Sequence, residues 1–290
     1  MSLITNTNVT SLISQRHLNE SSNRLKSSLE RLSSGYRINR ASDDAAGLSM
    51  SQNLTSEIRR MQQASRNVQD GQSVIDTADG ALSVIVDNLQ RVRELTVQAG
   101  NDTNDATARS SISNEIRSLM TDIDRISTST QLNGIHLLDG TATQAILQIG
   151  SGSNATNNVL DLSSGFTSAS SAGLGAVGTA PKTFANIGAV NLTTGTLARS
   201  FLTDIDSALQ SVNAQRAKLG AFQNQLISTD SNLSLGTQNF MASNSRIRDV
   251  DVASESATMA QTQVLTQAAT MVLSQTNDLP KMMLSLLQQH

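Results

Sequence analysis

Apolar residues recur every seven positions in two long stretches of the chain, and this pattern predicts two long helices. A strict seven-residue repeat of this length is typical of helices that pack on a partner as in a coiled coil. We expect the two helices to pack on each other, although a long stretch of chain separates them. The first set is Leu54, Met61, Val68, Ile75, Leu82 and Leu89, flanked by Ala64, Ala78, Ile85 and Val92, and the second set is Ile205, Val212, Leu219, Leu226, Leu233, Phe240 and Ile247.

A shorter helix and a β-hairpin are predicted between these long helices. From Ile112 to Ile126 the apolar residues alternate steps of four and three, as on one face of a helix that folds back on the first. Asn133-Gly134 and Asp139-Gly140 are turn signals, because Gly and Asn tolerate positive φ. Residues 145–149 have the composition of a short strand. We therefore predict a β-hairpin near residues 131–150.

The middle of the chain changes character at residues 151–198, which are rich in Gly, Ser, Thr, Ala and Asn. We expect a small irregular or β-rich insert at the surface. The predicted organisation is therefore mainly α. Terminal segments 1–45 and 251–290 form one part, a helical rod with the hairpin is formed by 46–150 and 199–250, and the insert is variable.

Narrow apolar stripes mark both ends of the chain, each on a single helix face. Burial of an apolar side chain contributes about 2 kcal/mol, whereas ordering the backbone costs about 1–2 kcal/mol per residue. The long seams have flanking residues and a third helix to offset this cost, but the ends do not. We therefore expect the ends to be partly disordered in a monomer and to fold when neighbouring subunits cover them, as in a polymer. The stripe residues are Leu18, Leu25, Leu29, Leu32, Val264, Leu265, Ala268, Met271 and Val272.

Composition narrows the possible functions. Aromatic residues make up 2% of the chain, so aliphatic surface must be buried along extended seams. The net charge of −3 argues against a nucleic-acid partner, which calls for a basic surface. The absence of cysteine excludes disulfides and thiolate metal sites. The first ten residues lack the features of a cleaved secretory signal, and no apolar run approaches the roughly 20 residues of a membrane span.

Candidate catalytic or metal-binding residues are few. Asp43 and Asp44 are adjacent, and neighbours on a helix diverge by roughly 100°, so their carboxylates converge poorly on one atom. Stabilisation of the N-terminus of the first long helix is the better account of this pair. The three histidines are isolated, and no His-Glu-x-x-His, Ser-His-Asp or phosphate-loop arrangement is evident. We predict no enzyme activity, no cofactor and no metal.

Four glycines interrupt the predicted long helices, each at a cost of about 1 kcal/mol relative to Ala. Close approach of another helix is the preferred explanation, and tolerated bending is the alternative. These residues are Gly71, Gly80, Gly220 and Gly236.

Several segments of the chain resemble bacterial flagellins in both order and spacing. The resemblance covers about residues 1–150 and 200–287, whereas the insert resembles no particular family. With so small an insert, the chain is similar to the short form of flagellin. The segments are Arg31–Leu48 (RLSSGYRINRASDDAAGL), Asp79–Leu82 (DGAL), Asn88–Gln98 (NLQRVRELTVQ), Gln131–Gly134 (QLNG), Ser245–Val252 (SRIRDVDV) and Leu279–Leu287 (LPKMMLSLL).

This resemblance implies a structural subunit of the extracellular flagellar filament. In the family, paired N- and C-terminal helices form a coiled coil that lines the filament channel, and three helices with a hairpin form the outer tube contacts. The subunit would leave the cell unfolded through the flagellar type III export apparatus, aided by a secretion chaperone, and add at the tip beneath the filament cap. Its partners would be further copies of itself and the hook–filament junction proteins.

The resemblance also implies that the flagellin-sensing Toll-like receptor of animals recognises the free monomer. The matching positions are Gln90, Arg91 and Leu95, with Glu115 on the next helix. Taken alone, the charges around residue 91 indicate a solvated face with local ion pairs. With the resemblance, contact with another subunit or with the receptor is favoured.

Two alternatives remain open from the sequence. A hook–filament junction protein resembles flagellin at both ends, but the near-complete motif at residues 88–98 favours flagellin. An unrelated secreted coiled-coil adhesin or effector would explain the seven-residue repeats but not the matching segments.

Overall fold

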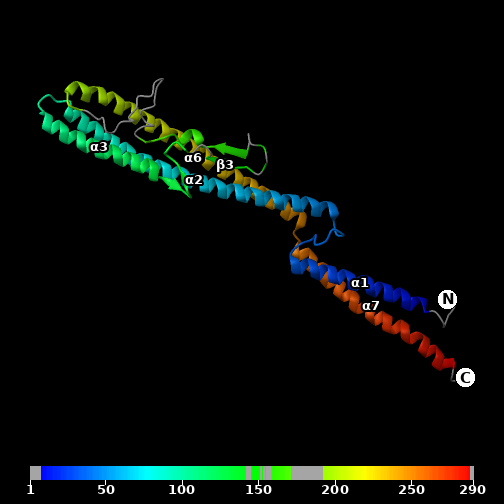
Figure 1. Ribbon diagram of the computed structural model, residues 1–290. Coiled ribbons are helices and arrows are strands. Elements are labelled where there is room, and N and C mark those ends of the chain that lie inside the picture. The colour runs from blue at the N-terminus through cyan, green and yellow to red at the C-terminus, as the bar shows by residue number, and fades with distance from the viewer. Residues whose placement is uncertain are drawn as a thin grey trace. The chain divides into compact units, whose positions relative to one another are not determined.

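The computed structural model describes residues 8–141, 145–150, 152, 154, 158–170 and 192–287, with only the backbone described at 279 and 281–287. Contacts between Cα atoms divide the chain into two compact units. Unit 1 comprises residues 1–58 and 239–290, and unit 2 comprises residues 59–238. The predicted mainly α fold with small strands is confirmed (Figure 1).

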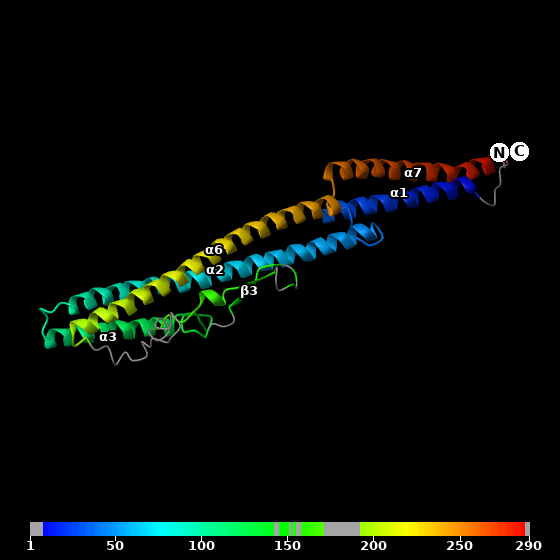
Figure 2. The ribbon, with the colours of Figure 1, turned by 90° about the horizontal axis from the view of Figure 1, so that it is seen from above.

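Unit 2 is built on two long antiparallel helices, α2 (Ala45–Ala99) and α6 (Gly195–Arg248), which both continue into unit 1. Figures 1 and 2 show these helices side by side with α3 (Ala106–Ser129). Within unit 2 both predicted columns of apolar residues face inward, and Val68 and Val212 have no exposed surface. The predicted helices and their mutual packing are therefore confirmed. The fully or almost fully buried column residues are Val68, Ile75, Leu82, Leu89, Ile205, Val212, Leu219, Leu226 and Leu233.

Polar pairs beside this seam define the register of α2 against α6. Ser65 donates to Asp230 at 2.6 Å, and the Nε atom of Arg216 lies 2.7 Å from Asp79. These two pairs are two heptads apart on each helix, from Ser65 to Asp79 on α2 and from Arg216 to Asp230 on α6. A uniform apolar repeat fits almost as well after a slip of one heptad, so such polar partners specify one register.

Helix α3 is capped by Asp105, whose side chain accepts a hydrogen bond from the amide of Ala108 at 2.7 Å. The predicted apolar face of this helix is confirmed, because Ile112, Ile116 and Ile123 are buried. These side chains join those of α2 and α6 in one hydrophobic core.

The β-hairpin is shorter than predicted. Strands β1 (Gln131–Leu132) and β2 (Ile135–His136) pair across Asn133 and Gly134, whose φ angles of 51° and 79° suit a tight hairpin turn. The predicted β-hairpin near residues 131–150 is therefore present, but it ends at β2, because Leu137 and Leu138 turn into the core.

The strand predicted at residues 145–149 is present as β3 (Ile146–Gln148), but its partner is β4 (Val159–Asp161) in the insert. A short 3-10 helix (Ser163–Gly165) follows β4. The insert was expected at the surface, but part of its described region is buried, because Leu162 and Phe166 are 1% and 3% exposed. Aliphatic and aromatic side chains outside any repeat can still fill a core, which periodicity alone does not detect. Residues 171–191 of the predicted insert lie outside the described residues.

Unit 1 contains a pair of helices, α1 (Val9–Ser34) and α7 (Val252–Leu287), together with the adjoining ends of α2 and α6. The predicted pairing of the N- and C-terminal helices is confirmed (Figures 1 and 2). The side chain of Asn8 donates to the carbonyl of Thr276 at 2.8 Å, so the start of α1 lies beside the last turns of α7.

The helix glycines have different environments. A Cβ atom on Gly71 would collide with the side chain of Leu147 in β3, and one on Gly236 would lie 3.3 Å from Met61. Close approach therefore accounts for these two positions. At Gly80 and Gly220, a Cβ atom would meet nothing within 4 Å, so packing within the described part of the chain does not require glycine there.

We predict that Gly80→Ala and Gly220→Ala each raise the free energy of unfolding by about 0.5–1 kcal/mol, because Ala favours the helix and meets open space. Gly71→Ala gains less, because Leu147 must move. Denaturant unfolding of the purified variants measures these differences. In a Leu147→Ala background, Gly71→Ala should recover the gain. An equal gain from Gly71→Ala in the unaltered chain would contradict the proposed role of Leu147.

Candidate contact surfaces

Hydroxyl side chains are interspersed with apolar ones in the seam between α1 and α7. On α1 the least exposed residues alternate between Ser and Leu at steps of four and three. On α7 the corresponding positions contain Thr, Met, Ala and Leu. A seam of this composition buries little apolar area, so it contributes far less than the α2–α6 seam. The α1 positions are Ser14, Leu18, Ser21, Leu25, Ser28 and Leu32, and the α7 positions are Met259, Thr262, Thr266, Ala269, Leu273 and Thr276.

The buried hydroxyls of Ser14, Thr262 and Thr276 bond to their own helices rather than across the seam. Ser14 donates to the carbonyl of Thr10 at 2.9 Å, and Thr262 donates to that of Thr258 at 2.7 Å. These bonds satisfy the hydroxyl groups but do not tie one helix to the other. Described polar links between the helices lie near the two ends of the pair. They are Asn8–Thr276, Ser11–Asn277 at 2.6 Å and Arg31–Glu255 at 3.6 Å.

Large apolar side chains lie on the outside of the pair. The predicted α7 stripe is exposed along its whole length, and Met271 and Val264 are 66% and 64% exposed. The predicted α1 stripe is divided, because Leu29 is half exposed while Leu18, Leu25 and Leu32 are partly buried in the seam. We call the exposed apolar residues of α1 and α7 the terminal-helix surface. It comprises Val9, Leu12, Ile13, Leu29, Val252, Val264, Leu265, Ala268, Met271 and Val272.

Sequence reasoning missed the α7 seam. Its positions from residue 259 to residue 276 follow steps of three and four, the same spacing as an apolar stripe. Because the residues are mainly Thr and Ala, a search for large apolar side chains selects the opposite face. The repeat of small residues is the signal that identifies it.

The segment that follows α1 lies against the segment that precedes α7. Tyr36 and Asp249 form an isolated antiparallel bridge, and the amide of Val250 donates to the carbonyl of Gly35 at 3.0 Å. The guanidinium of Arg248 lies 4.2 Å from the centre of the Tyr36 ring, a cation–π contact. These contacts fix the two segments against each other within unit 1.

The two adjacent aspartates before α2 have separate structural roles. Asp44 caps α2 by accepting from the amide of Gly47 at 2.8 Å, as the prediction for this helix N-terminus requires. Asp43 instead closes the preceding loop. The amides of Arg40 and Asn39 donate to its carboxylate at 2.9 and 3.1 Å and hold the pKa of Asp43 below its ordinary value.

The residues expected at a receptor or subunit contact do not all lie on the surface. Gln90, Arg91 and Glu115 are exposed, and Arg91 is 3.0 Å from Glu115 across α2 and α3. Hydrogen bonds to Glu115, and secondarily to Glu94, raise the pKa of the Arg91 guanidinium. Leu95, which was expected at this surface, does not lie on it, because its side chain is 3% exposed and belongs to the core. It supports the surface from below rather than offering a contact.

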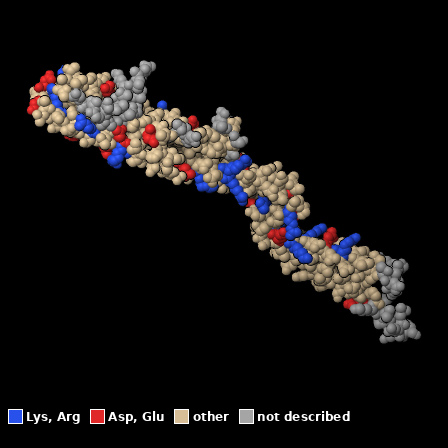
Figure 3. All heavy atoms as spheres, in the orientation of Figure 1, with Lys and Arg blue, Asp and Glu red and all other residues tan. Residues whose placement is uncertain are grey.

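On the face drawn in Figure 3, charged residues lie in several groups rather than in one patch. Wide areas of uncharged residues separate these groups of Lys, Arg, Asp and Glu. Within the described part of the chain, no group of three or more His, Asp or Glu residues is placed to hold a metal ion. None of the described helices has the length and apolarity needed to cross a membrane.

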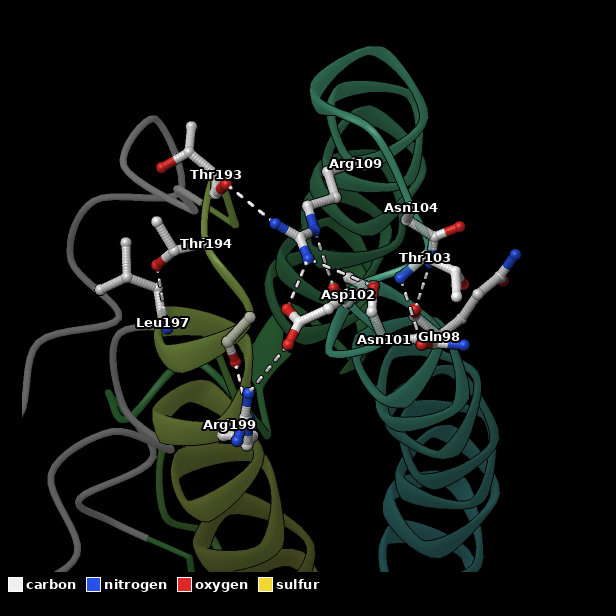
Figure 4. A network of polar contacts seen from close by, with 12 residues as sticks. Gln98, Asn101, Asp102, Thr103, Asn104, Arg109, Thr193, Thr194, Leu197 and Arg199 are labelled. Atoms are coloured by element: carbon white, nitrogen blue, oxygen red, sulfur yellow. Dashed lines mark hydrogen bonds and ion pairs between the residues drawn. The ribbon is translucent and has the colours of Figure 1, made fainter.

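Arg109 joins three segments at the end of unit 2 where α2, α3 and α6 meet (Figure 4). Its Nε donates to the carbonyl of Ala99, Nη2 to that of Asn101, and Nη1 to that of Thr193, each at 3.2 Å. Nη2 also lies 3.1 Å from Asp102, and the side chain is 12% exposed. Backbone carbonyls supply most of the acceptors, so the sequence contains no pattern that would have identified this residue.

Comparison with known proteins identifies a family whose described regions are the N-terminal and C-terminal helices. Residues 5–143 match the family model described as the bacterial flagellin N-terminal helical region, and residues 202–287 match the C-terminal helical region. The chain belongs to the bacterial flagellin family. It is a filament subunit and a structural protein, as the sequence resemblance implied.

The chain is similar over its whole length to individual flagellins. It is 40% identical to a flagellin of Halalkalibacterium halodurans, with 99% of this chain and 100% of the relative covered. It is 43% identical to a flagellin of Bacillus subtilis, with 98% and 99% covered. A putative flagellar hook-associated protein of Vibrio parahaemolyticus has a TM-score of 0.58 at 15% identity, covering 71% of this chain and all of the other. That likeness shows a shared fold alone.

We predict that Arg109→Lys lowers the free energy of unfolding by about 2–3 kcal/mol, because an ammonium group cannot reach the three carbonyls together. Arg199→Lys is the matched control. Arg199 is 64% exposed and lies 3.9 Å from Asp102, so its loss should change stability by no more than about 0.5 kcal/mol. Denaturant unfolding compares the two variants, and equal effects would rule out a special role for Arg109.

Proposed function

We propose that this chain polymerises through the terminal-helix surface. The observation that carries the proposal is the arrangement of the α1–α7 pair, whose seam mixes hydroxyl and partly buried apolar side chains while nine large apolar side chains are exposed outside it. Covering nine half-exposed large apolar residues at about 1 kcal/mol each would give roughly 9 kcal/mol per subunit before the cost of association.

Neighbouring subunits would then complete the core that the terminal helices lack. In this proposal α1 and α7 are partly disordered in the free monomer and become stably helical on assembly. Segments 1–45 and 251–290 would form the channel-lining part of the filament, and 46–150 with 199–250 the outer tube. A chain that folds fully only on assembly also suits export in the unfolded state through the flagellar type III apparatus, with a secretion chaperone, followed by addition beneath the cap and onto the junction proteins.

We predict that Val264→Ser combined with Val272→Ser raises the critical concentration for polymerisation by about tenfold or more, because two apolar contacts between subunits are lost. Sedimentation and electron microscopy measure assembly. Ile146→Ser in β3, where the Ile is 58% exposed, is the matched control and should assemble normally. Helix content by circular dichroism should rise when the unaltered chain assembles.

Assembly of the double variant at the normal critical concentration would exclude this surface as the polymerisation contact. A helix content that is equal in monomer and polymer would exclude disordered ends in the monomer while leaving the contact itself in place.

A second proposed role is recognition of the free monomer by the host flagellin-sensing Toll-like receptor. The favouring observation is the surface formed by Gln90, Arg91 and Glu115, in which Arg91 pairs with Glu94 on its own helix and with Glu115 on α3. A fixed guanidinium loses little side-chain entropy on binding, which favours its use as a contact.

We predict that Arg91→Ala reduces receptor signalling by purified monomer by about tenfold, as expected when a central interface arginine is removed. Arg125→Ala is the control, since Arg125 is likewise exposed on the same bundle and paired with Asp122. Dose–response curves in receptor-expressing cells provide the measurement. Equal curves for both variants would place the contact elsewhere.

A further inference from the structure

Methionine provides the readily oxidised side chains of this protein. The chain has nine Met, no Cys and no Trp. Thioether sulfur reacts with peroxides when solvent reaches it, so exposure decides which Met is attacked. Met271 is 66% exposed, Met50 57% and Met241 46%, whereas Met120 is 2% exposed in the core of unit 2.

Met271 combines high exposure with a place on the terminal-helix surface. It is the most exposed of the large apolar residues of the described chain, and it follows Val264 by seven positions on the same face of α7. Val272 is beside it, and Ala268 lies one turn earlier. A change of polarity at this position therefore alters that face.

We propose that Met271 is an oxidation site that controls assembly, an inference that rests on the proposed polymerisation surface. Hydrogen peroxide transfers one oxygen atom to Sδ: the O–O bond breaks, an S–O bond forms, sulfur loses two electrons, and the peroxide is reduced to water. The product is a sulfoxide, whose oxygen is a strong hydrogen-bond acceptor. Buried among aliphatic side chains without a donor, that oxygen opposes association.

The same geometry makes the modification specific to the free subunit. In the monomer Met271 is open to solvent, whereas in the polymer neighbouring subunits cover it. Oxidation therefore prevents the addition of new subunits and spares those already assembled. A dithiol-dependent methionine sulfoxide reductase removes the oxygen as water and restores the thioether.

The test compares the unaltered chain, Met271→Leu and Met120→Leu, each exposed as monomer to the same dose of hydrogen peroxide. Peptide mass spectrometry measures oxidation at each Met, and sedimentation measures the critical concentration. Oxidation should raise the critical concentration of the unaltered chain and of Met120→Leu about tenfold, and that of Met271→Leu less than twofold. Methionine sulfoxide reductase should reverse the effect. Without oxidant, Met271→Gln should imitate the sulfoxide.

The outcomes separate this inference from the proposed function. If untreated protein does not polymerise, the proposed function fails and this inference fails with it. If untreated protein polymerises but oxidation impairs the unaltered chain and Met271→Leu equally, only the role of Met271 is overturned. Oxidation of Met271 at the same rate in filaments as in monomers would also overturn it, because the residue would then be uncovered in the polymer.

Discussion

The structure of unit 2 depends on one interaction, the continuous apolar seam between α2 and α6. It joins two segments that are far apart in the chain. The helix α3 and the small strands lie between these segments in the sequence, and their buried side chains join the same core. Leu82, Ile85 and Leu89 are completely or almost completely buried, which a chain poor in aromatic residues achieves by length rather than bulk. Polar partners such as Asp79 and Arg216 add the register that a uniform repeat leaves undefined.

The two helix seams differ in composition and contribute differently to the stability of the chain. The aliphatic α2–α6 seam supplies a core within one chain, whereas the α1–α7 seam contains hydroxyls that bond to their own helices. A weak inner seam and an apolar outside fit helices whose stability depends on neighbours. Polar links such as those of Asn8 and Arg31 lie near the ends of the pair, where they favour one register of the two helices.

Periodicity predicted most of the fold, since the helices and the inward faces of α2, α3 and α6 follow from spacing alone. It did not predict buried positions or contacts that do not repeat along the sequence. The core position of Phe166 depends on tertiary packing, and the clamp at Arg109 uses backbone carbonyls that any residue provides. Leu95 shows a related limit: a matching motif identifies a segment of helix but not which of its side chains points outward. The outer face of α7 was found because its residues are large, and its seam was missed because they are small.

The separation of these two faces on α7 has a consequence for how sequence can vary. Around the helix, Thr262 and Met271 point in nearly opposite directions, so substitutions on one face leave the other almost unchanged. Inner positions must fit against α1, and hydroxyls satisfied by their own helix meet that condition without adding strength. In the proposed polymer, outer positions must remain apolar for contact with other subunits. The strength of assembly would then change through the outer face while the pairing of the chain ends is preserved.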